Sequence, residues 1–296
     1  MAPRLADTPQ ILRTRGWADY GLVDSGDGKK LERYGAQRVI RPEPQCLWRP
    51  AQPDLWDQAT ATFDPSDEDE AGAWRFTSKP PETWELGWGR TRFNARFTAF
   101  RHLAFFPEQA ANWAWLEQAV SARERPRVLN LFGYTGVASL VCAAAGAEVT
   151  HVDASKKAIG WARENQEMAR LADKPIRWIV EDAQKFAERE ARRGNRYDIV
   201  LLDPPAYGRG PKGEVWQLFD NLPGMVELCR EILTPRPFAV VLTAYSIRAS
   251  FFAMHALMRD AFAGMGGTVE SGELVIREKG VGRALSTSLF SRWVAA

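Results

Sequence analysis

The segment 197–210, YDIVLLDPPAYGRG, ends an apolar run on an acid that two prolines follow at once. Neither proline carries an N–H, so this corner offers a substrate only hydrogen-bond acceptors, namely carbonyls and the Asp203 carboxylate. We predict that Asp203 and the Pro204 carbonyl hold an N–H donor such as an exocyclic amine, and that Tyr207 stacks on a planar substrate. The alternative is a stiff loop in which Asp203 caps a neighbouring group.

A glycine turn and an acid twenty positions later form a second set. The segment 129–139, LNLFGYTGVAS, predicts a strand, a turn at Gly133 and the start of a helix that Gly136 allows to approach closely. Asp153 ends the next apolar run, where a carboxylate can bind both hydroxyls of a ribose. These residues indicate a nucleoside cofactor. A structural turn with a surface acid is the alternative.

The glycine spacing limits the kind of nucleoside. Dinucleotide sites carry G-x-G-x-x-G, whose second glycine admits the pyrophosphate, whereas Tyr134 and Thr135 leave only G-x-x-G here. A cofactor without phosphates therefore fits better. Asp182 ends the third apolar run, and we predict that it accepts the adenine amino group while Ala183 packs against the ring. Asp182 can also cap the following helix, and the two roles are compatible.

Alternating strand-like and helical segments position these residues. Repeated β–α units predict an α/β fold, a Rossmann-like doubly wound and mostly parallel sheet with helices on both faces. Two strand-like segments with no helix between them add an antiparallel C-terminal hairpin. The expected strands are 127–133, 147–155, 176–182, 197–203, 238–246, 268–278 and 284–294, and the expected helices are 107–120, 136–146, 156–171, 183–193, 217–233 and 250–266.

The first hundred residues differ in composition from the rest of the chain, with frequent Gly and Pro and isolated aromatic residues. The segment 19–35 predicts a hairpin that turns at 26–28. We expect a smaller β-rich N-terminal domain, 1–103, that takes part in substrate binding, and a cofactor-binding domain, 104–296. The stretch 90–101 interleaves arginines with phenylalanines, which is typical of RNA binding and equally of a half-buried strand.

Composition narrows the class of protein. The 39 basic and 37 acidic residues give a net charge of +2, which neither requires nor excludes a nucleic-acid partner. The three cysteines contain no C-x-x-C pair and the three histidines show no metal-ligand spacing, so no metal is expected. The apolar runs are too short to span a bilayer and the N-terminus lacks the core of a signal peptide, so a cytoplasmic location is expected. The oligomeric state is left open.

Gly133, Gly136, Asp153, Asp182 and the DPPAY motif, in this order, resemble class I S-adenosylmethionine-dependent methyltransferases over 104–296. The resemblance implies S-adenosylmethionine as the cofactor. More narrowly, LNLFGYTG, VDAS, EDA, DPPAYGRG and the N-terminal 19–35 resemble the large-subunit ribosomal RNA methyltransferase group, which implies a base in ribosomal RNA as substrate. The implied catalytic residues are Asp203, Pro204 and Tyr207, and the implied cofactor-binding residues are Asn130, Phe132, Gly133, Tyr134, Thr135, Gly136, Asp153, Ala154, Asp182, Ala183 and Asp203.

Relatives of that group include cytosine-C5 enzymes, which need a cysteine nucleophile after the fifth strand. The corresponding segment here is LTAYS, 242–246, which has no cysteine, so we expect no covalent C5 chemistry. Arg209, Lys212 and Arg248 flank the DPP corner and are candidates for phosphate contacts. The alternatives are a methyltransferase for a protein or small molecule, a non-catalytic RNA-binding relative and a nicotinamide oxidoreductase.

Overall fold

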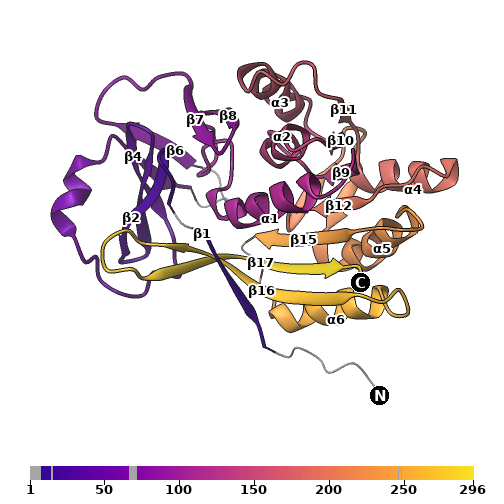
Figure 1. Cartoon of the computed structure of the whole chain (residues 1–296). Helices are drawn as coiled ribbons and strands as arrows, with labels where there is room; N and C mark the ends of the chain where they lie inside the picture. Colours follow the sequence, from indigo (N-terminus) through magenta and orange to yellow (C-terminus); the bar gives the residue numbers. More distant parts are fainter. Residues whose placement is uncertain (1–7, 15, 67–71, 246, 248) are drawn as a thin grey trace. The chain divides into compact units, whose positions relative to one another are not determined.

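The computed structural model describes residues 8–14, 16–66, 72–245, 247 and 249–296 (Figure 1). The chain divides into two compact units. The C-terminal unit comprises Asn112–Leu274 and Thr287–Ala296 with the segment up to Leu12, and the N-terminal unit comprises Arg13–Ala111 and Val275–Ser286. The predicted domain boundary between residues 103 and 104 stays a prediction, because compactness does not measure independent folding.

The C-terminal unit is built on a sheet with the strand order β1-β16-β17-β15-β12-β9-β10-β11. Strands β15, β12, β9, β10 and β11 pair in parallel, and β17 pairs antiparallel with β15. The predicted doubly wound, mostly parallel sheet with a C-terminal hairpin is confirmed, and β1 adds an edge strand that the sequence does not predict. The strands span Gln10–Thr14 (β1), Arg127–Leu131 (β9), Glu148–Asp153 (β10), Ile176–Val180 (β11), Ile199–Leu202 (β12), Ala239–Tyr245 (β15), Thr268–Arg277 (β16) and Ala284–Val294 (β17).

Side chains of the parallel strands alternate between two core clusters, because successive residues of a strand point to opposite faces. Val128 and Leu201 lie in a cluster with residues of α1 and α2. Their neighbours Leu129 and Leu202 lie in a cluster with residues of α4, α5 and α6. Helices thus cover both faces, which is why β12 is apolar and buried throughout. The helices span Ala110–Ser121 (α1), Val137–Ala144 (α2), Lys156–Met168 (α3), Ala183–Arg193 (α4), Leu218–Glu231 (α5) and Phe251–Ala261 (α6).

The N-terminal unit holds a sheet of order β2-β3-β4-β5-β6 and a separate hairpin of β7 and β8. The predicted hairpin 19–35 is confirmed, since β2 and β3 pair antiparallel. Its turn places Asp27 and Gly28 at positive φ, 50° and 72°. The strands span Tyr20–Gly26 (β2), Lys29–Tyr34 (β3), Gln37–Pro42 (β4), Ala61–Pro65 (β5), Gly72–Phe76 (β6), Trp84–Trp88 (β7) and Thr91–Ala95 (β8).

The basic and aromatic stretch 90–101 packs two of its three phenylalanine rings within this unit, while Phe100 is 47% exposed. Phe93 on β8 is fully buried. The ring of Phe97 lies 4.9 Å from that of Trp74 and 5.0 Å from that of Trp84, measured between centroids. These rings are already packed, so the half-buried strand describes Phe93 and Phe97 better than a surface for stacking RNA bases.

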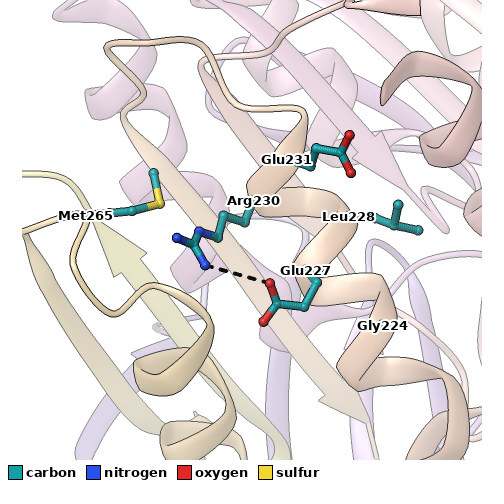
Figure 2. A pocket seen from close by; sticks show the side chains of 6 residues that line it. All are labelled: Gly224, Glu227, Leu228, Arg230, Glu231 and Met265. Atoms are coloured by element: carbon teal, nitrogen blue, oxygen red, sulfur yellow. Dashed lines mark ion pairs between the residues drawn. The ribbon is translucent and has the colours of Figure 1, made fainter. Parts of the chain in front are cut away.

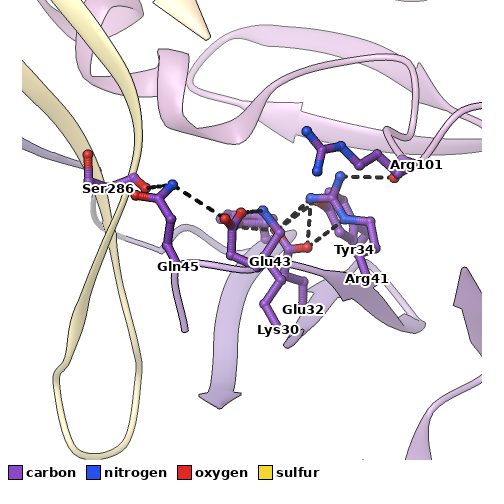
Figure 3. Close-up of polar contacts among 9 residues, drawn as sticks. Lys30, Glu32, Tyr34, Arg41, Glu43, Gln45, Arg101 and Ser286 are labelled. Atoms are coloured by element: carbon purple, nitrogen blue, oxygen red, sulfur yellow. Dashed lines mark hydrogen bonds and ion pairs between the residues drawn. The ribbon is translucent and has the colours of Figure 1, made fainter. Parts of the chain in front are cut away.

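A buried polar cluster stabilises the same unit (Figure 3). Glu32 is fully buried and accepts hydrogen bonds from the hydroxyls of Tyr20 and Tyr34, each at 3.0 Å. The Arg41 guanidinium donates to both Glu32 oxygens, at 2.7 Å from Nε and 2.9 Å from Nη2. Burial raises the pKa of Glu32, but the charges of Arg41 and Lys30 and the hydrogen bonds outweigh it, so the pKa is lowered overall.

Arg41→Met should lower the free energy of unfolding by about 3–5 kcal/mol, because Glu32 would stay buried without its partner charge. Urea denaturation followed by tryptophan fluorescence measures this loss. Arg75→Ala is the matched control, since Arg75 pairs with Asp64 on the exposed surface and its removal should hardly move the midpoint. Equal midpoints for the wild type and Arg41→Met would contradict the stabilising role of the buried pair.

Candidate active site

The ends of four neighbouring strands bring the predicted residues to one edge of the sheet. Strands β12, β9, β10 and β11 are adjacent and parallel, so their carboxyl ends meet at the same edge. Gly133 follows β9, Asp153 ends β10, Asp182 follows β11 and Asp203 follows β12. The glycine turn therefore lies between Asp203 on one side and Asp153 on the other, with Asp182 one strand further out.

The corner that follows β9 has a strained backbone. The φ angle is 58° at Phe132 and 51° at Tyr134, a left-handed conformation that residues with a side chain rarely adopt. The Tyr134 N–H donates to Asp153 Oδ2 at 2.8 Å, and the Gly133 N–H donates to the Val152 carbonyl at 3.1 Å. Each such residue costs on the order of 1–3 kcal/mol, and strain of this kind concentrates at functional sites. The hydrogen bonds from β10 hold this corner in shape.

The two glycines are required for different reasons. Gly133 lies outside the left-handed region, and a Cβ at this position would lie 2.4 Å from Cε1 of His151. Gly136 has a φ of 81°, and a Cβ there would lie 2.9 Å from the Trp178 ring. The predicted turn is present, since the Gly136 N–H donates to the Gly133 carbonyl at 3.1 Å, and its left-handed glycine is Gly136. The close approach predicted at Gly136 is also present, because Trp178 and Ala162 leave no room for a side chain there. Gly133 is required because the buried histidine leaves no room for a side chain.

A buried hydrogen-bonded group supports the corner from inside the sheet. Asn130 Nδ2 donates to Ser139 Oγ at 2.9 Å, and the same oxygen lies 2.9 Å from His151 Nδ1. All three side chains are at most 3% exposed. Burial lowers the pKa of His151 to about 3, against a backbone hydrogen bond with Tyr134 that raises it, so the imidazole is neutral at physiological pH. Asn130, which the sequence analysis predicts to bind the cofactor, uses its side-chain amide within this supporting group. A histidine inside an apolar strand was the feature of the sequence that could have indicated the group.

Asp153 fits a ribose. Its Oδ1 accepts the Ser155 N–H and its Oδ2 the Tyr134 N–H, both at 2.8 Å. A carboxylate oxygen has two acceptor positions, so each oxygen retains one for a hydroxyl. Burial raises the pKa of Asp153, and the two backbone hydrogen bonds lower it in part. Because the segment 129–139 contains no basic residue to balance a phosphate, these residues suit a phosphate-free nucleoside.

The remaining predicted cofactor residues surround this corner. Asp182 caps α4, since its Oδ1 accepts the Lys185 N–H at 2.9 Å, so the capping role is confirmed and the adenine role stays a prediction. Ala183 is 3% exposed and belongs to the core, which leaves little of its side chain for a ligand. Thr135 is also buried, whereas Ala154, Phe132 and Tyr134 are half-buried at the edge.

The Asp203 corner is tied to the next strand. Asp203 Oδ1 accepts the Thr243 hydroxyl at 2.6 Å, and Thr243 on β15 is 3% exposed. Thr243 thus orients the carboxylate, as the capping alternative predicts. The contact is compatible with the predicted role of Asp203 toward a substrate. Pro204 is buried and Pro205 is exposed. Thr243 was hidden in the sequence because a single threonine in an apolar run is common.

Trp216 joins the two corners. Its Nε1 donates to the Pro205 carbonyl at 2.8 Å, and its ring centroid lies 4.8 Å from that of Phe132. Trp216 belongs to β14 (Val215–Gln217), which pairs antiparallel with β13 (Tyr207–Arg209). The sequence predicts a loop here, and the structure corrects it to a hairpin. Tyr207 is 55% exposed on this hairpin, as a stacking surface requires.

A full-length relative decides the family. The crystal structure of the SAM dependent methyltransferase from Agrobacterium tumefaciens matches with a TM-score of 0.95, at 61% identity over 98% of this chain and 94% of that chain. The chain belongs to the S-adenosylmethionine-dependent methyltransferases. The nicotinamide oxidoreductase alternative is therefore dropped, and S-adenosylmethionine is the cofactor.

Partial matches place the methyltransferase near a narrower group. The model of the family described as Conserved hypothetical protein 95 matches residues 109–222. The ribosomal RNA large subunit methyltransferase K/L of Hahella chejuensis is 31% identical over 146 residues, which are 49% of this chain and 19% of that protein. The chain spans 19% to 31% of the length of three curated relatives that it matches. The crystal structure of SMU.776 complexed with SAH, 17% identical with a TM-score of 0.74 over 93% of this chain and 75% of that chain, shares the fold.

A hollow of about 570 Å³ lies elsewhere in the methyltransferase (Figure 2). It is lined by Gly224, Glu227, Leu228, Arg230 and Glu231 of α5 and by Met265. The residue after that helix, Ile232, accepts the N–H of Tyr197, which precedes β12. The hollow is therefore near the amino end of β12, opposite the edge that carries Asp203.

None of the helices in the described ranges of the chain is long and apolar enough to cross a membrane. Within the same ranges, no group of three or more His, Cys, Asp or Glu side chains is placed to hold a metal ion. Arg248 lies outside the described residues.

Asp153→Ala should weaken S-adenosylmethionine binding tenfold or more, because charge-assisted hydrogen bonds worth roughly 1.5–3 kcal/mol are lost. Titration calorimetry measures the change. Asp153→Asn keeps one acceptor oxygen for the Tyr134 N–H, so its affinity for S-adenosylmethionine should lie between those of the wild type and Asp153→Ala. Asp260→Ala removes an exposed acid of α6 and should bind as the wild type does. An unchanged affinity in Asp153→Ala would remove this residue from the cofactor site.

Proposed function

We propose that the methyltransferase transfers a methyl group to an amine of a base in RNA, and that the RNA is ribosomal. The observation that carries the proposal is the acceptor-only corner at Asp203, which directly adjoins the Phe132–Gly136 corner on the neighbouring strand. Relatives named as ribosomal RNA large subunit methyltransferases support the substrate class. Ribosomal RNA as substrate also implies a cytoplasmic location, which we include in the proposal.

S-adenosylmethionine supplies an electrophilic methyl group on a sulfonium. The protein contributes position and polarity, which are the main requirements of an in-line displacement. The base amine donates its N–H groups to Asp203 and to the Pro204 carbonyl, and its lone pair then faces the methyl carbon. With the cofactor bound, the Asp203 carboxylate would stabilise the positive charge that develops on the amine nitrogen as it takes the methyl group. S-adenosylhomocysteine would be the leaving group, and the proton of the methylated amine would pass to solvent. Thr243 orients Asp203 for this role through its hydroxyl.

The positions of the cysteines support an amine acceptor over cytosine C5. Ala244 occupies the place where a C5 enzyme needs its nucleophile, and it is 1% exposed on β15. Cys142 lies on α2 and Cys229 near the end of α5, both fully buried, and burial raises each thiol pKa to about 12. Burial also raises the pKa of Cys46, in the N-terminal unit, to about 11. None of these thiols would supply a thiolate at neutral pH.

The substrate class can be tested with labelled cofactor and fractionated acceptors. We expect label in ribosomal RNA, and mass spectrometry of its nucleosides from a deletion strain should show one methylated base missing. Label that enters protein or small molecules instead would overturn the RNA assignment. Cofactor binding without transfer to any fraction would favour a non-catalytic relative.

Asp203→Ala should reduce kcat far more than S-adenosylmethionine affinity, because the lost interactions are strongest while the methyl group is in transfer. Thr243→Val should reduce kcat less, since Asp203 remains but is less well oriented. Tyr207→Ala should raise the RNA KM as a stacking surface worth roughly 1–3 kcal/mol is removed. Single-turnover rates and calorimetry separate these effects. An Asp203→Ala enzyme with wild-type turnover would exclude the mechanism.

Cys46→Ala, Cys142→Ala and Cys229→Ala should each retain turnover, with some loss of stability because small cavities open in the core. The measurement is methyl transfer by the folded fraction of each variant. RNA containing 5-fluorocytosine provides the opposite test, since C5 enzymes are trapped on it covalently. A trapped adduct that disappears when one cysteine is mutated would restore the C5 mechanism.

A further inference from the structure

The β13–β14 hairpin has one face packed on the protein and one face open to solvent. Trp216 points inward and is 4% exposed, while its strand neighbours Val215 and Gln217 are exposed, Val215 by 50%. On the opposite strand Tyr207 and Arg209 are exposed as well. Tyr207 pairs with Gln217 and Arg209 with Val215, so these four side chains lie on the same outward face.

The hairpin is held at both ends, so this face has a fixed position. At its base, Trp216 binds the Pro205 carbonyl. At its turn, Glu214 Oε2 accepts the Lys212 N–H at 2.8 Å, and Glu214 Oε1 pairs with Lys185 of α4 at 2.7 Å. A face held in this way is preorganised, which reduces the ordering cost of binding.

The charge of the hairpin is left positive by these contacts. The segment 207–217 contains one acidic residue, Glu214, and its charge is already balanced by an ion pair with Lys185. Arg209 and Lys212 have no ion-pair partner among the described residues. The exposed ring of Tyr207, four residues after Asp203, is therefore followed in the chain by two cations that have no ion-pair partner among the described residues. Phe219, 62% exposed at the start of α5, adds a second ring nearby in the chain.

We propose that this outward face, with Lys212 at its turn, binds the single-stranded RNA segment next to the base that is methylated. The proposal rests on the proposed function and extends it from the reacting base to its neighbours. Stacking on exposed aromatic rings and phosphate contacts with Arg and Lys are the usual means of binding single strands. Residues 207 and 209 lie about 6.8 Å apart along the strand, which suits contacts to successive nucleotides.

The test uses the full-length protein with S-adenosylhomocysteine and a fluorescent 12-nucleotide uridine RNA. Anisotropy is measured over a range of salt concentrations for the wild type and for Arg209→Ala/Lys212→Ala. Arg192→Ala/Arg193→Ala is the matched control. It removes two exposed cations from the last turn of α4, at the opposite edge of the sheet. Calorimetric binding of S-adenosylmethionine shows that each variant is folded.

If Arg209→Ala/Lys212→Ala loses two phosphate contacts, the slope of log affinity against log salt should become about 1.4 less steep than that of the wild type. At 0.1 M salt this change corresponds to about 25-fold weaker RNA binding. The control should keep the wild-type slope. If the wild type methylates RNA while the Arg209→Ala/Lys212→Ala variant keeps both slope and affinity, the hairpin surface is refuted and the proposed function stands. If the variant loses RNA binding but the wild type methylates no RNA, the surface stands and the proposed function is refuted.

Discussion

The hydrogen bond from the Tyr134 N–H to the Asp153 carboxylate joins the ends of β9 and β10, and the rest of the site is arranged around it. The bond holds Tyr134 in a left-handed conformation that the residue would not adopt unaided. It also fixes Asp153, whose remaining acceptor positions then face outward in one orientation. The same carboxylate thus fixes the backbone of the corner and provides the proposed binding group, so this part of the site is preorganised before a ligand binds.

Behind this corner lies a polar layer that never meets solvent. The Ser139 hydroxyl links the Asn130 amide to Nδ1 of His151, and the neutral imidazole fills the space that Gly133 leaves open. A charged histidine in that position would carry an unpaired buried charge, and burial accordingly lowers its pKa. A polar group can therefore support a functional loop without adding charge near the cofactor.

The Asp203 corner, which we propose faces the substrate, is built differently, together with a hairpin that depends on one indole. Trp216 packs against Phe132 of the corner after β9 and donates to the Pro205 carbonyl of the corner after β12. A shift of either corner would be transmitted to the other through this side chain, because both contacts are made by one rigid ring system. Thr243 acts similarly on Asp203 from β15. The two corners that we propose for the site are in this way positioned by Trp216 and Thr243, which lie on β14 and β15.

The sequence by itself determined the mostly parallel sheet of repeated β–α units and the strand ends that carry Gly133, Asp153 and Asp203. These features follow from local patterns, since apolar periodicity and residues directly after a strand depend on near neighbours in the chain. The tertiary structure decided the rest. The need for glycine at 133 depends on His151, the hairpin depends on Trp216 meeting Pro205, and the packing of Phe97 depends on Trp74 and Trp84 from other strands. Each of these is a contact between residues distant in sequence, and only the packing of complete elements brings such residues together.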